Sequence, residues 1–322
     1  MRHSFRLLLL NAFLRLVVKN ALAVTKTPQQ MRDQFERTAA RLFRAPEDAN
    51  FVADTIRRNG NGEPSGPSGS GGGLIEAVWA SRGRPDRRRV ILYLHGGAYL
   101  AGSSRTHRHL GAWLAGAAGV RALLPDYRLA PEHPFPAGLD DALIAYRHLL
   151  ESGYSAQNIA LAGDSAGGGL IFALLLKLRA EGRPDPACLV AFSPWLDMTM
   201  TRGSLRRNAR RDVLLPVRRF REVVTHYLQG TMTTEPLASP IYGEFPDPPP
   251  TQIMVSKSEI LRDDGVAMAD KLRAAGGDVA LELWKDMPHA WQIFAGMLPE
   301  ADTAVEQAGQ FIARHLRPEA GD

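Results

Sequence analysis

One short stretch in the middle of the chain holds a side chain that could act as a nucleophile. Residues 163–167 read GDSAG, follow the apolar run 158–162 and precede a helical pattern over 170–179. A serine at the apex of a strand-turn-helix is typical of the G-x-S-x-G nucleophile elbow, whose strained turn requires small residues two positions before and after it. The helix N-terminus beneath the turn favours developing negative charge. We therefore predict that Ser165 attacks a carbonyl carbon; the alternative is an ordinary glycine-rich turn with a surface serine.

A second glycine-rich turn could supply hydrogen-bond donors to that reaction. Residues 88–94 read as a buried strand, and HGGAY follows directly at 95–99. Acyl transfer needs backbone N–H groups aimed at the oxyanion, and consecutive glycines let the chain approach a substrate closely. A His-Gly-Gly turn after a strand is typical of the oxyanion loop of lipases and esterases. We predict that the donors are the N–H groups of Gly96, Gly97 and Ala166.

Three histidines follow the serine, and one of them must be the base if the chain order is serine, acid, histidine. His315 falls in an amphipathic C-terminal helical pattern, and His226 falls in an arginine-rich one. His289 follows the strand-like run 278–284 and a short loop. A loop at the end of a sheet strand is where such a base belongs. We predict that His289 takes the proton of Ser165.

Three carboxylates compete for the role of the acid. The strand-like run 251–256 is followed by Glu259 in a loop, and by Asp263 and Asp264 in the first turn of a helix. Capping and the helix dipole favour carboxylates in a first helical turn, so the two aspartates need no further explanation. We predict that Glu259 orients His289 and stabilises its protonated form, with Asp263 as the alternative.

Together these motifs resemble the bacterial hormone-sensitive-lipase-like esterases, family IV of the bacterial lipolytic enzymes. The resemblance runs from about Leu74 to the C-terminus, and its motifs are HGGAY at 95–99, DYRLAPEHPFPAGLDDA at 126–142, GDSAGG at 163–168, SPWLDMT at 193–199, EILRDD at 259–264 and the His289 loop. It implies an α/β-hydrolase fold, a helical cap and hydrolysis of short- to medium-chain carboxylic esters. Family members usually have aspartate where this chain has Glu259, and Gly-Phe where it has Ala290-Trp291.

The resemblance also implies a substrate pocket limited by the cap. We expect Trp291 to narrow or reshape the alcohol side of that pocket. Asp164 is expected to anchor the loop around the elbow and to take no part in the proton relay. The residues predicted near the pocket are Tyr99, Asp164, Trp195, Leu196 and Trp291.

Strand-like and helical patterns alternate from Leu74 onward, which predicts a mostly parallel central sheet flanked by helices. The expected strands are 74–80, 88–94, 120–125, 158–162, 187–192, 251–256 and 278–284. We divide the chain into four parts on this basis. These are N-terminal cap helices (1–58), a flexible Gly/Ser/Pro connection (59–73), an α/β-hydrolase core (74–199 and 231–322) and a second cap segment (200–230).

Composition limits what else the protein can be. A chain of 322 residues with 45% hydrophobic residues can hold one large α/β domain and a small appendage. The single cysteine, Cys188, excludes an internal disulfide and is expected to be a buried core residue. The sequence has neither a C-x-x-C nor an H-E-x-x-H pattern, so we expect no metal and no cofactor.

The net charge is +5, and arginines are concentrated between residues 202 and 221. No series of stacking aromatics and no nucleic-acid motif accompanies them, so we expect no nucleic-acid partner. A solvated helix face is one interpretation of the arginines, and transient contact with an anionic lipid surface is the other. The small-molecule ester is the expected partner, and helices near the C-terminus could pair subunits in a homodimer, as in relatives.

The first residues of the chain allow two interpretations. Basic residues followed by an apolar run and Ala21-Leu22-Ala23 are typical of a signal peptide over Met1 to Ala23, which would make the protein exported. However, Arg15 and Lys19 interrupt the apolar run, and Arg15 shares one side of a helical wheel with other polar residues. We expect an amphipathic cap helix and a cytoplasmic protein. A spanning helix is disfavoured because no run of about 18 uncharged apolar residues exists.

The predicted function is that of a serine carboxylesterase working through an acyl-enzyme intermediate. A lactone hydrolase with the same triad is an alternative, because the same residues can open a cyclic ester. A second alternative is a non-catalytic small-molecule receptor of the same fold that has lost its base. The presence of both Ser165 and His289 argues against a receptor.

Overall fold

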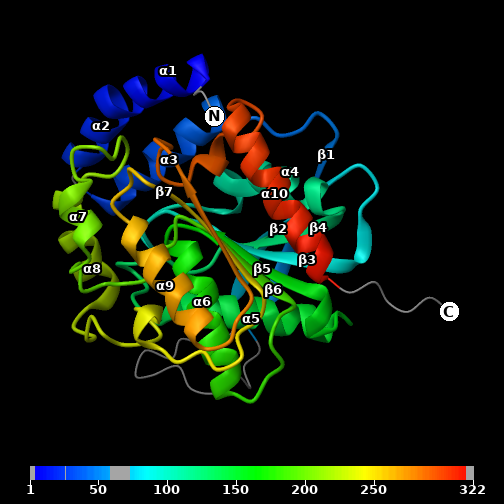
Figure 1. Cartoon of the computed structure of the whole chain (residues 1–322). Helices are drawn as coiled ribbons and strands as arrows, with labels where there is room; N and C mark the ends of the chain where they lie inside the picture. Colours follow the sequence, from blue (N-terminus) through cyan, green and yellow to red (C-terminus); the bar gives the residue numbers. More distant parts are fainter. Residues whose placement is uncertain (1–3, 26, 59–72, 317–322) are drawn as a thin grey trace.

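A computed structural model describes residues 4–25, 27–58 and 73–316, and an eight-stranded sheet lies at its centre (Figure 1). The strand order is β1-β2-β4-β3-β5-β6-β7-β8. β2 pairs antiparallel with β1 and β4, and the other pairs are parallel. The strands are β1 (Ala49–Arg57), β2 (Leu74–Arg82), β3 (Asp86–Leu94), β4 (Val120–Pro125), β5 (Ile159–Asp164), β6 (Cys188–Phe192), β7 (Thr251–Ser256) and β8 (Val279–Trp284).

The mostly parallel sheet and its seven expected strands are confirmed, with ends that differ by at most two residues. The prediction that residues 1–58 form cap helices is wrong for residues 49–57, which form β1. β1 lies at the sheet edge, and only Ile56 in it is fully buried. Its polar residues interrupt the alternation of apolar residues that identifies a strand.

Two layers of helices cover the faces of the sheet. Along β3, Val90 and Leu92 pack in one core cluster, whereas Ile91 and Tyr93 pack in the other, as expected for alternating side chains. The first cluster lies under α5 (Ala137–Glu151), α6 (Ala166–Ala180) and α9 (Arg262–Ala274). The second lies under α4 (Ser104–Ala118) and α10 (Pro299–His315). Cys188 is buried in the second cluster, as predicted.

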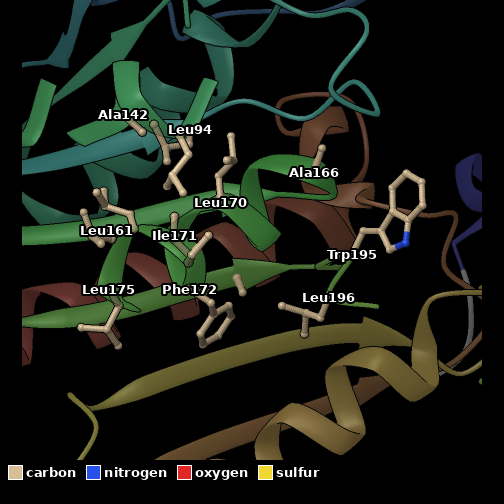
Figure 2. Close-up of a cluster of buried hydrophobic side chains, with 14 of the residues drawn as sticks. Leu94, Ala142, Leu161, Ala166, Leu170, Ile171, Phe172, Leu175, Trp195 and Leu196 are labelled. Atoms are coloured by element: carbon tan, nitrogen blue, oxygen red, sulfur yellow. The ribbon is translucent and has the colours of Figure 1, made fainter. Parts of the chain in front are cut away.

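α6 is central to the position of the site because it is apolar on nearly all sides. Figure 2 shows Leu170, Ile171 and Phe172 of this helix among side chains of β3, β5 and α5. A helix that is apolar all round must be buried, and a densely packed interior leaves it little freedom to shift. The first residue of α6, Ala166, belongs to the same cluster. The start of α6 is therefore fixed by the core.

Two segments far apart in the sequence meet outside the sheet. The N-terminal one forms a continuous helix from α1 (Phe5–Phe13) through a π-helical turn (Leu14–Val18) to α2 (Lys19–Val24), followed by α3 (Pro28–Leu42). The other contains α7 (Gly203–Arg207) and α8 (Phe220–Leu228). Lys19 Nζ donates to the carbonyl oxygens of Ala209 and Asp212 at 3.0 and 2.6 Å, which joins the two segments. Figure 1 shows α1, α2, α7 and α8 on the same side of the molecule.

Some predictions fall partly outside the described residues. The expected connection 59–73 lies outside them except for Gly73, and so do the first three residues of Met1 to Ala23, the alternative signal peptide. The helix Phe5–Val24 is long and apolar enough, by length and composition alone, to cross a membrane. Because this finding concerns length and composition alone, the expectation that the helix does not span a membrane stays a prediction.

Gly309 lies where α10 crosses α4, and its substitution tests how closely these helices pack. A Cβ at this position would lie 2.3 Å from the Ala117 Cβ. Gly309→Ala should therefore lower the free energy of unfolding by about 1–3 kcal/mol, although alanine in a helix is intrinsically favoured over glycine by about 1 kcal/mol. Urea unfolding followed by circular dichroism measures the change, with Gln310→Ala on the exposed side of α10 as the control. A more stable Gly309→Ala would contradict the close contact.

Candidate active site

Ser165 forms the whole of a sharp turn between a strand and a helix. β5 ends at Asp164 and α6 begins at Ala166. Ser165 itself has a φ of +53°, in the left-handed region that side chains other than glycine rarely adopt. Its N–H donates to the Phe192 carbonyl at 2.8 Å, which ties the turn to the end of β6. The strain is therefore held by the sheet on one side and by the buried α6 on the other.

The two glycines that flank the turn have no room for a side chain. A Cβ on Gly167 would lie 1.9 Å from the Leu94 carbonyl oxygen. A Cβ on Gly163 would lie 2.6 Å from the backbone of Gly167. The expectation that both positions must be small is confirmed, and its cause is the close approach of the α6 start to the ends of β3 and β5.

A chain of short hydrogen bonds joins Ser165 to a histidine and a glutamate. His289 Nε2 lies 2.8 Å from Ser165 Oγ, and His289 Nδ1 lies 2.6 Å from Glu259 Oε2. Glu259 and His289 come from the loops after β7 and β8. Both are buried, whereas the Ser165 side of the cluster is partly exposed. The structure thus brings together the three side chains predicted to act together.

The electrostatic surroundings of His289 favour its charged form. Burial acts to lower the pKa of the imidazole, but the hydrogen bond from Nδ1 to Glu259 and the charge of that carboxylate act in the opposite direction. The net result is a pKa raised above the usual histidine value. An imidazole with a raised pKa is a stronger base, which suits acceptance of a proton from a hydroxyl.

Glu259 is held from several sides by residues that sequence reasoning did not assign. Its Oε1 accepts from Ser193 Oγ at 2.9 Å and from the Ser256 N–H at 2.6 Å. Asn208 Nδ2 donates to the Glu259 carbonyl at 2.8 Å, and Asp212 accepts from the next backbone N–H along the chain at 2.9 Å. Ser193 stands in the SPWLDMT motif, which is a signal that could have identified it, whereas Asn208 and Asp212 lie in the arginine-rich segment.

The two competing aspartates have other partners. Asp263 accepts from the Ser204 N–H at 2.9 Å. Asp264 accepts from the Leu196 and Asp197 N–H groups at 2.9 and 3.0 Å, so it ties the loop after β6 to α9. Its burial raises the pKa of its carboxyl group to about 8, against the opposing effect of the Leu196 hydrogen bond. Among the described residues, Glu259 is the acid that is hydrogen bonded to His289.

The predicted oxyanion donors need one correction. The Gly96 N–H donates to Asp164 Oδ1 at 3.0 Å and is therefore already occupied. Within the described ranges, no hydrogen bond is made by the N–H of Gly97 or Ala98 or by that of Ala166, the first residue of α6. Gly97 and Ala98 have φ values of +127° and +57°. Ala98, which was not predicted, thus joins Gly97 and Ala166 as a candidate donor in place of Gly96.

Asp164 anchors the loop around the elbow, as the sequence analysis expected. Its Oδ1 accepts from the Tyr93 hydroxyl at 2.8 Å as well as from Gly96, and it lies 3.4 Å from His107 Nε2. Burial acts to raise the pKa of Asp164, but His107 and the hydrogen bonds lower it below its usual value. Its carboxylate is thus buried and hydrogen bonded within the protein, which does not fit a wall of the substrate pocket.

The other predicted pocket residues separate into two groups. Tyr99 stacks on Tyr227 of α8 with ring centroids 3.9 Å apart, and the Trp195 ring lies 6.0 Å from Tyr99. Both therefore lie between the elbow and the second predicted cap segment. Leu196 is a core residue beneath the elbow (Figure 2). Trp291 is fully buried in the cluster between the sheet and the α4–α10 layer, so the prediction that it shapes the alcohol side does not fit its position.

The two remaining late histidines lie outside this cluster. His226 faces Glu222 of its own helix at 3.8 Å, and His315 Nδ1 bonds the Phe311 carbonyl at 2.8 Å. Within the part of the chain that is described, no group of three or more His, Cys, Asp or Glu side chains is arranged to hold a metal ion.

Comparison with known proteins agrees with this geometry. Residues 91–293 match a family described as having the alpha/beta hydrolase fold. An acetyl-hydrolase of Streptomyces hygroscopicus is 43% identical over 74% of this chain and 80% of its own length. The chain therefore belongs to this α/β-hydrolase family.

Two crystal structures resemble the whole chain. One is of an esterase from the bacterial hormone-sensitive lipase family, with 39% identity, a TM-score of 0.86, and coverage of 98% of this chain and 100% of the other. The second is of EstE5 soaked with p-nitrophenyl butyrate, with 35% identity, a TM-score of 0.87, and coverage of 97% and 99%. The predicted fold and the resemblance to hormone-sensitive-lipase-like esterases are confirmed.

Gly167→Ala tests whether the elbow positions Ser165. The new methyl group would overlap the Leu94 carbonyl oxygen, so α6 must move away from β3 and carry the hydroxyl away from His289. We expect the rate of labelling of Ser165 by a fluorophosphonate to fall by at least about a hundredfold. Gly168→Ala is the comparison variant, because its Cβ would lie 3.0 Å from Pro194, a tight contact but a smaller overlap, so its labelling should fall less. Labelling of Gly167→Ala at the wild-type rate, with unchanged circular dichroism, would contradict the elbow constraint.

Proposed function

We propose that this protein is a serine carboxylesterase that hydrolyses short- to medium-chain carboxylic esters through an acyl-enzyme intermediate. Carboxylic ester hydrolysis as the activity is borne out by relatives named esterase and acetyl-hydrolase. The observation that carries the assignment of residues is the continuous hydrogen-bond chain from Glu259 through His289 to Ser165. We propose these three as acid, base and nucleophile.

In the first half of the reaction, Ser165 Oγ attacks the ester carbonyl carbon while His289 Nε2 takes the hydroxyl proton. The positive charge that forms on the imidazole is stabilised by Glu259, which lies 2.6 Å from Nδ1. His289 then gives the proton to the leaving alcohol oxygen, and the carbon–oxygen bond of the ester breaks. Ser165 is left carrying the acyl group.

The second half repeats these steps with water as the nucleophile. His289 takes a proton from water, the hydroxide oxygen bonds to the acyl carbon, and the proton returns to Ser165 Oγ as the acid leaves. Both halves pass through a tetrahedral intermediate with a negatively charged oxygen. The N–H groups of Gly97, Ala98 and Ala166 are the proposed donors to that oxygen, and loss of one such donor typically costs about 2.7–4 kcal/mol of barrier.

The preference for short or medium acyl chains is supported by the aromatic side chains near the elbow. Tyr99 stacks on Tyr227, and Trp195 lies 4.7 Å from the Phe220 ring, so α8 is packed against this side of the site. Bulky rings that pack on one another limit the space beside Ser165, and therefore the length of the acyl chain that fits there. The soaking of EstE5 with p-nitrophenyl butyrate is compatible with a short acyl group.

We further propose that the N-terminal helices and residues 200–230 form a two-part cap over the hydrolase core. The hydrogen bonds from Lys19 to the second segment support this division. We also propose that the protein is cytoplasmic, that it contacts a lipid surface and that it forms a homodimer. Hydrogen bonds from Ser4 to Glu300 and from Asn11 to the Asp286 carbonyl support a helix that stays with the folded chain.

Substitution of the nucleophile tests the proposed function directly. Ser165→Ala removes the oxygen that is proposed to carry the acyl group, so hydrolysis of p-nitrophenyl butyrate should fall to the background rate, at least about 10³-fold below the wild type. The assay is release of p-nitrophenol, with unchanged thermal unfolding as the check that the variant is folded. Near-normal turnover by Ser165→Ala would refute the mechanism.

Glu259→Gln tests the acid and its effect on the base. The variant should lower kcat by about 10³–10⁴-fold, because the imidazolium loses its counter-charge and the imidazole its orientation. The reaction needs neutral His289, so kcat/KM falls as the pH drops through the raised pKa of His289. Without the Glu259 carboxylate, burial still lowers that pKa and only the smaller effects of Asp212 and Asp164 raise it, so the acidic limb should move to lower pH. A pH–rate profile measures both effects.

Asp263→Asn is the control for this experiment, because Asp263 bonds Ser204 and Arg207 instead of His289. Its kcat should change by less than about tenfold, with the acidic limb in place. If Asp263→Asn were the more damaging substitution, the acid would have to be reassigned.

A further inference from the structure

The N-terminal helix turns an apolar side toward solvent. A soluble protein normally buries the apolar side of such a helix, and a contiguous exposed apolar patch marks an interaction site. The exposed positions recur along α1 and the π-helical turn, and one lies at the end of α2. They are Phe5 (73% exposed), Leu8 (55%), Leu9 (57%), Phe13 (42%), Leu16 (69%), Val17 (52%) and Val24 (68%).

The opposite side of the same helix is fastened to the protein along its length. Leu7 and Leu14 are buried in the core under α10. Ser4 donates from its N–H and its hydroxyl to the Glu300 carboxylate at 2.7 and 2.9 Å. At the other end, Lys19 Nζ bonds carbonyl oxygens of the second cap segment. These contacts fix the orientation of the helix with its apolar side outward, so the exposure is built into the fold.

Arginines lie beside this apolar surface. Arg15 Nη2 donates to the Arg211 carbonyl at 3.3 Å, and Arg218 Nη2 donates to the Ala23 carbonyl at 3.3 Å. These two bonds place the segment 202–221 directly along the N-terminal helix. That segment contains eight arginines and one acidic residue, Asp212, which is buried.

Several of these arginines have no acidic partner to neutralise them. Arg202, Arg207 and Arg219 form ion pairs with carboxylates at 2.9 Å or less. Of the described residues, no Asp or Glu oxygen is within ion-pair distance of four further arginines, all exposed. These four are Arg206, Arg210, Arg218 and Arg221.

We infer that the helix Phe5–Val24 and the neighbouring arginines form a surface that binds an anionic lipid bilayer. The helix would lie in the plane of the membrane with its apolar side chains at the acyl boundary, while the arginines meet the negative headgroups. A second copy of the chain fits less well, because the arginine rims of two copies would repel each other. A spanning orientation would require the helix to give up its contacts with Glu300 and with the Asp212 carbonyl.

This inference goes beyond the proposed chemistry, because it concerns where the protein meets its substrate. The elements beside the membrane surface would be α1, α2, α7 and α8, which are on one side of the molecule (Figure 1). Tyr227 of α8 stacks on Tyr99 next to the elbow. Esters dissolved in a bilayer would therefore reach the protein on its cap side.

Vesicle binding by the full chain tests this surface. The probe is sedimentation with vesicles of phosphatidylcholine alone or mixed with phosphatidylglycerol. We expect binding to the mixed vesicles, weakened by salt. Leu9→Gln combined with Leu16→Gln should lower the partition coefficient by at least about tenfold. Val52→Gln, an equally exposed apolar position at the edge of the sheet, is the matched control and should bind as the wild type does.

The charged part of the surface needs a second variant. Arg206→Gln combined with Arg210→Gln should lower binding to the mixed vesicles and reduce its salt dependence, because two of the four unpaired arginines are lost. Both double variants should hydrolyse soluble p-nitrophenyl butyrate at the wild-type rate, and Ser165→Ala should bind vesicles as the wild type does. The last comparison separates failure of this inference from failure of the proposed function.

Four results would overturn the inference. One is a wild-type protein that does not bind the mixed vesicles, and another is a leucine variant that binds them unchanged. The third is an intact mass showing that residues of α1 and α2 are removed from the mature protein, as a signal sequence would be. The fourth is a wild-type dimer that the leucine substitutions dissociate while vesicle binding is absent.

Discussion

The close approach of α6 to the ends of β3 and β5 is the constraint on which the rest of the site depends. It leaves no space for a Cβ at Gly163 or Gly167 and forces a positive φ on Ser165. Such strain persists only where the surroundings over-determine it. Here the surroundings are α6, buried nearly all round, and a backbone bond from Ser165 to β6. A hydroxyl fixed in this way can be met by a histidine from a distant loop at hydrogen-bond distance without any further adjustment of the chain.

Three buried carboxyl groups hold the loops around the site in place, and each one holds a different loop. Asp164 holds Gly96, in the loop of the proposed oxyanion donors, against the elbow. Glu259 faces His289 with one carboxylate oxygen, and two hydrogen-bond donors hold its other oxygen although it is buried. Asp264 ties the loop after β6 to the start of α9. Because a buried polar group is costly unless it is hydrogen bonded, each of these groups restricts the geometry of the loops around it more strongly than an apolar contact would.

The sequence identified the cluster of Ser165, Glu259 and His289 because local motifs and chain order are enough to define it. The features that could not be predicted from the sequence depend on three-dimensional contacts, which local sequence patterns do not indicate. β1 is an edge strand with few buried residues, so its apolar alternation is weak. The shift of the candidate donor from Gly96 to Ala98 follows from the Asp164 side chain, and a sequence motif cannot tell which of several successive N–H groups is occupied. Trp291 follows His289 closely in the sequence, which predicts a place in the substrate pocket. The 3-10 turn there instead buries its ring in the core cluster under α4 and α10.

Asp212 connects the parts of the molecule that the sequence leaves far apart. One of its carboxylate oxygens accepts from the backbone N–H groups of Leu214 and Leu215, and the other accepts from that of Ile260, next to Glu259. Its own carbonyl oxygen accepts from Lys19 of the N-terminal helix at 2.6 Å. A single residue in the arginine-rich segment thus links the outer helix to the loop that carries the proposed acid. The segment 200–230, the proposed second part of the cap, therefore supports the site from the side, and the geometry at His289 depends in part on residues that take no part in the chemistry.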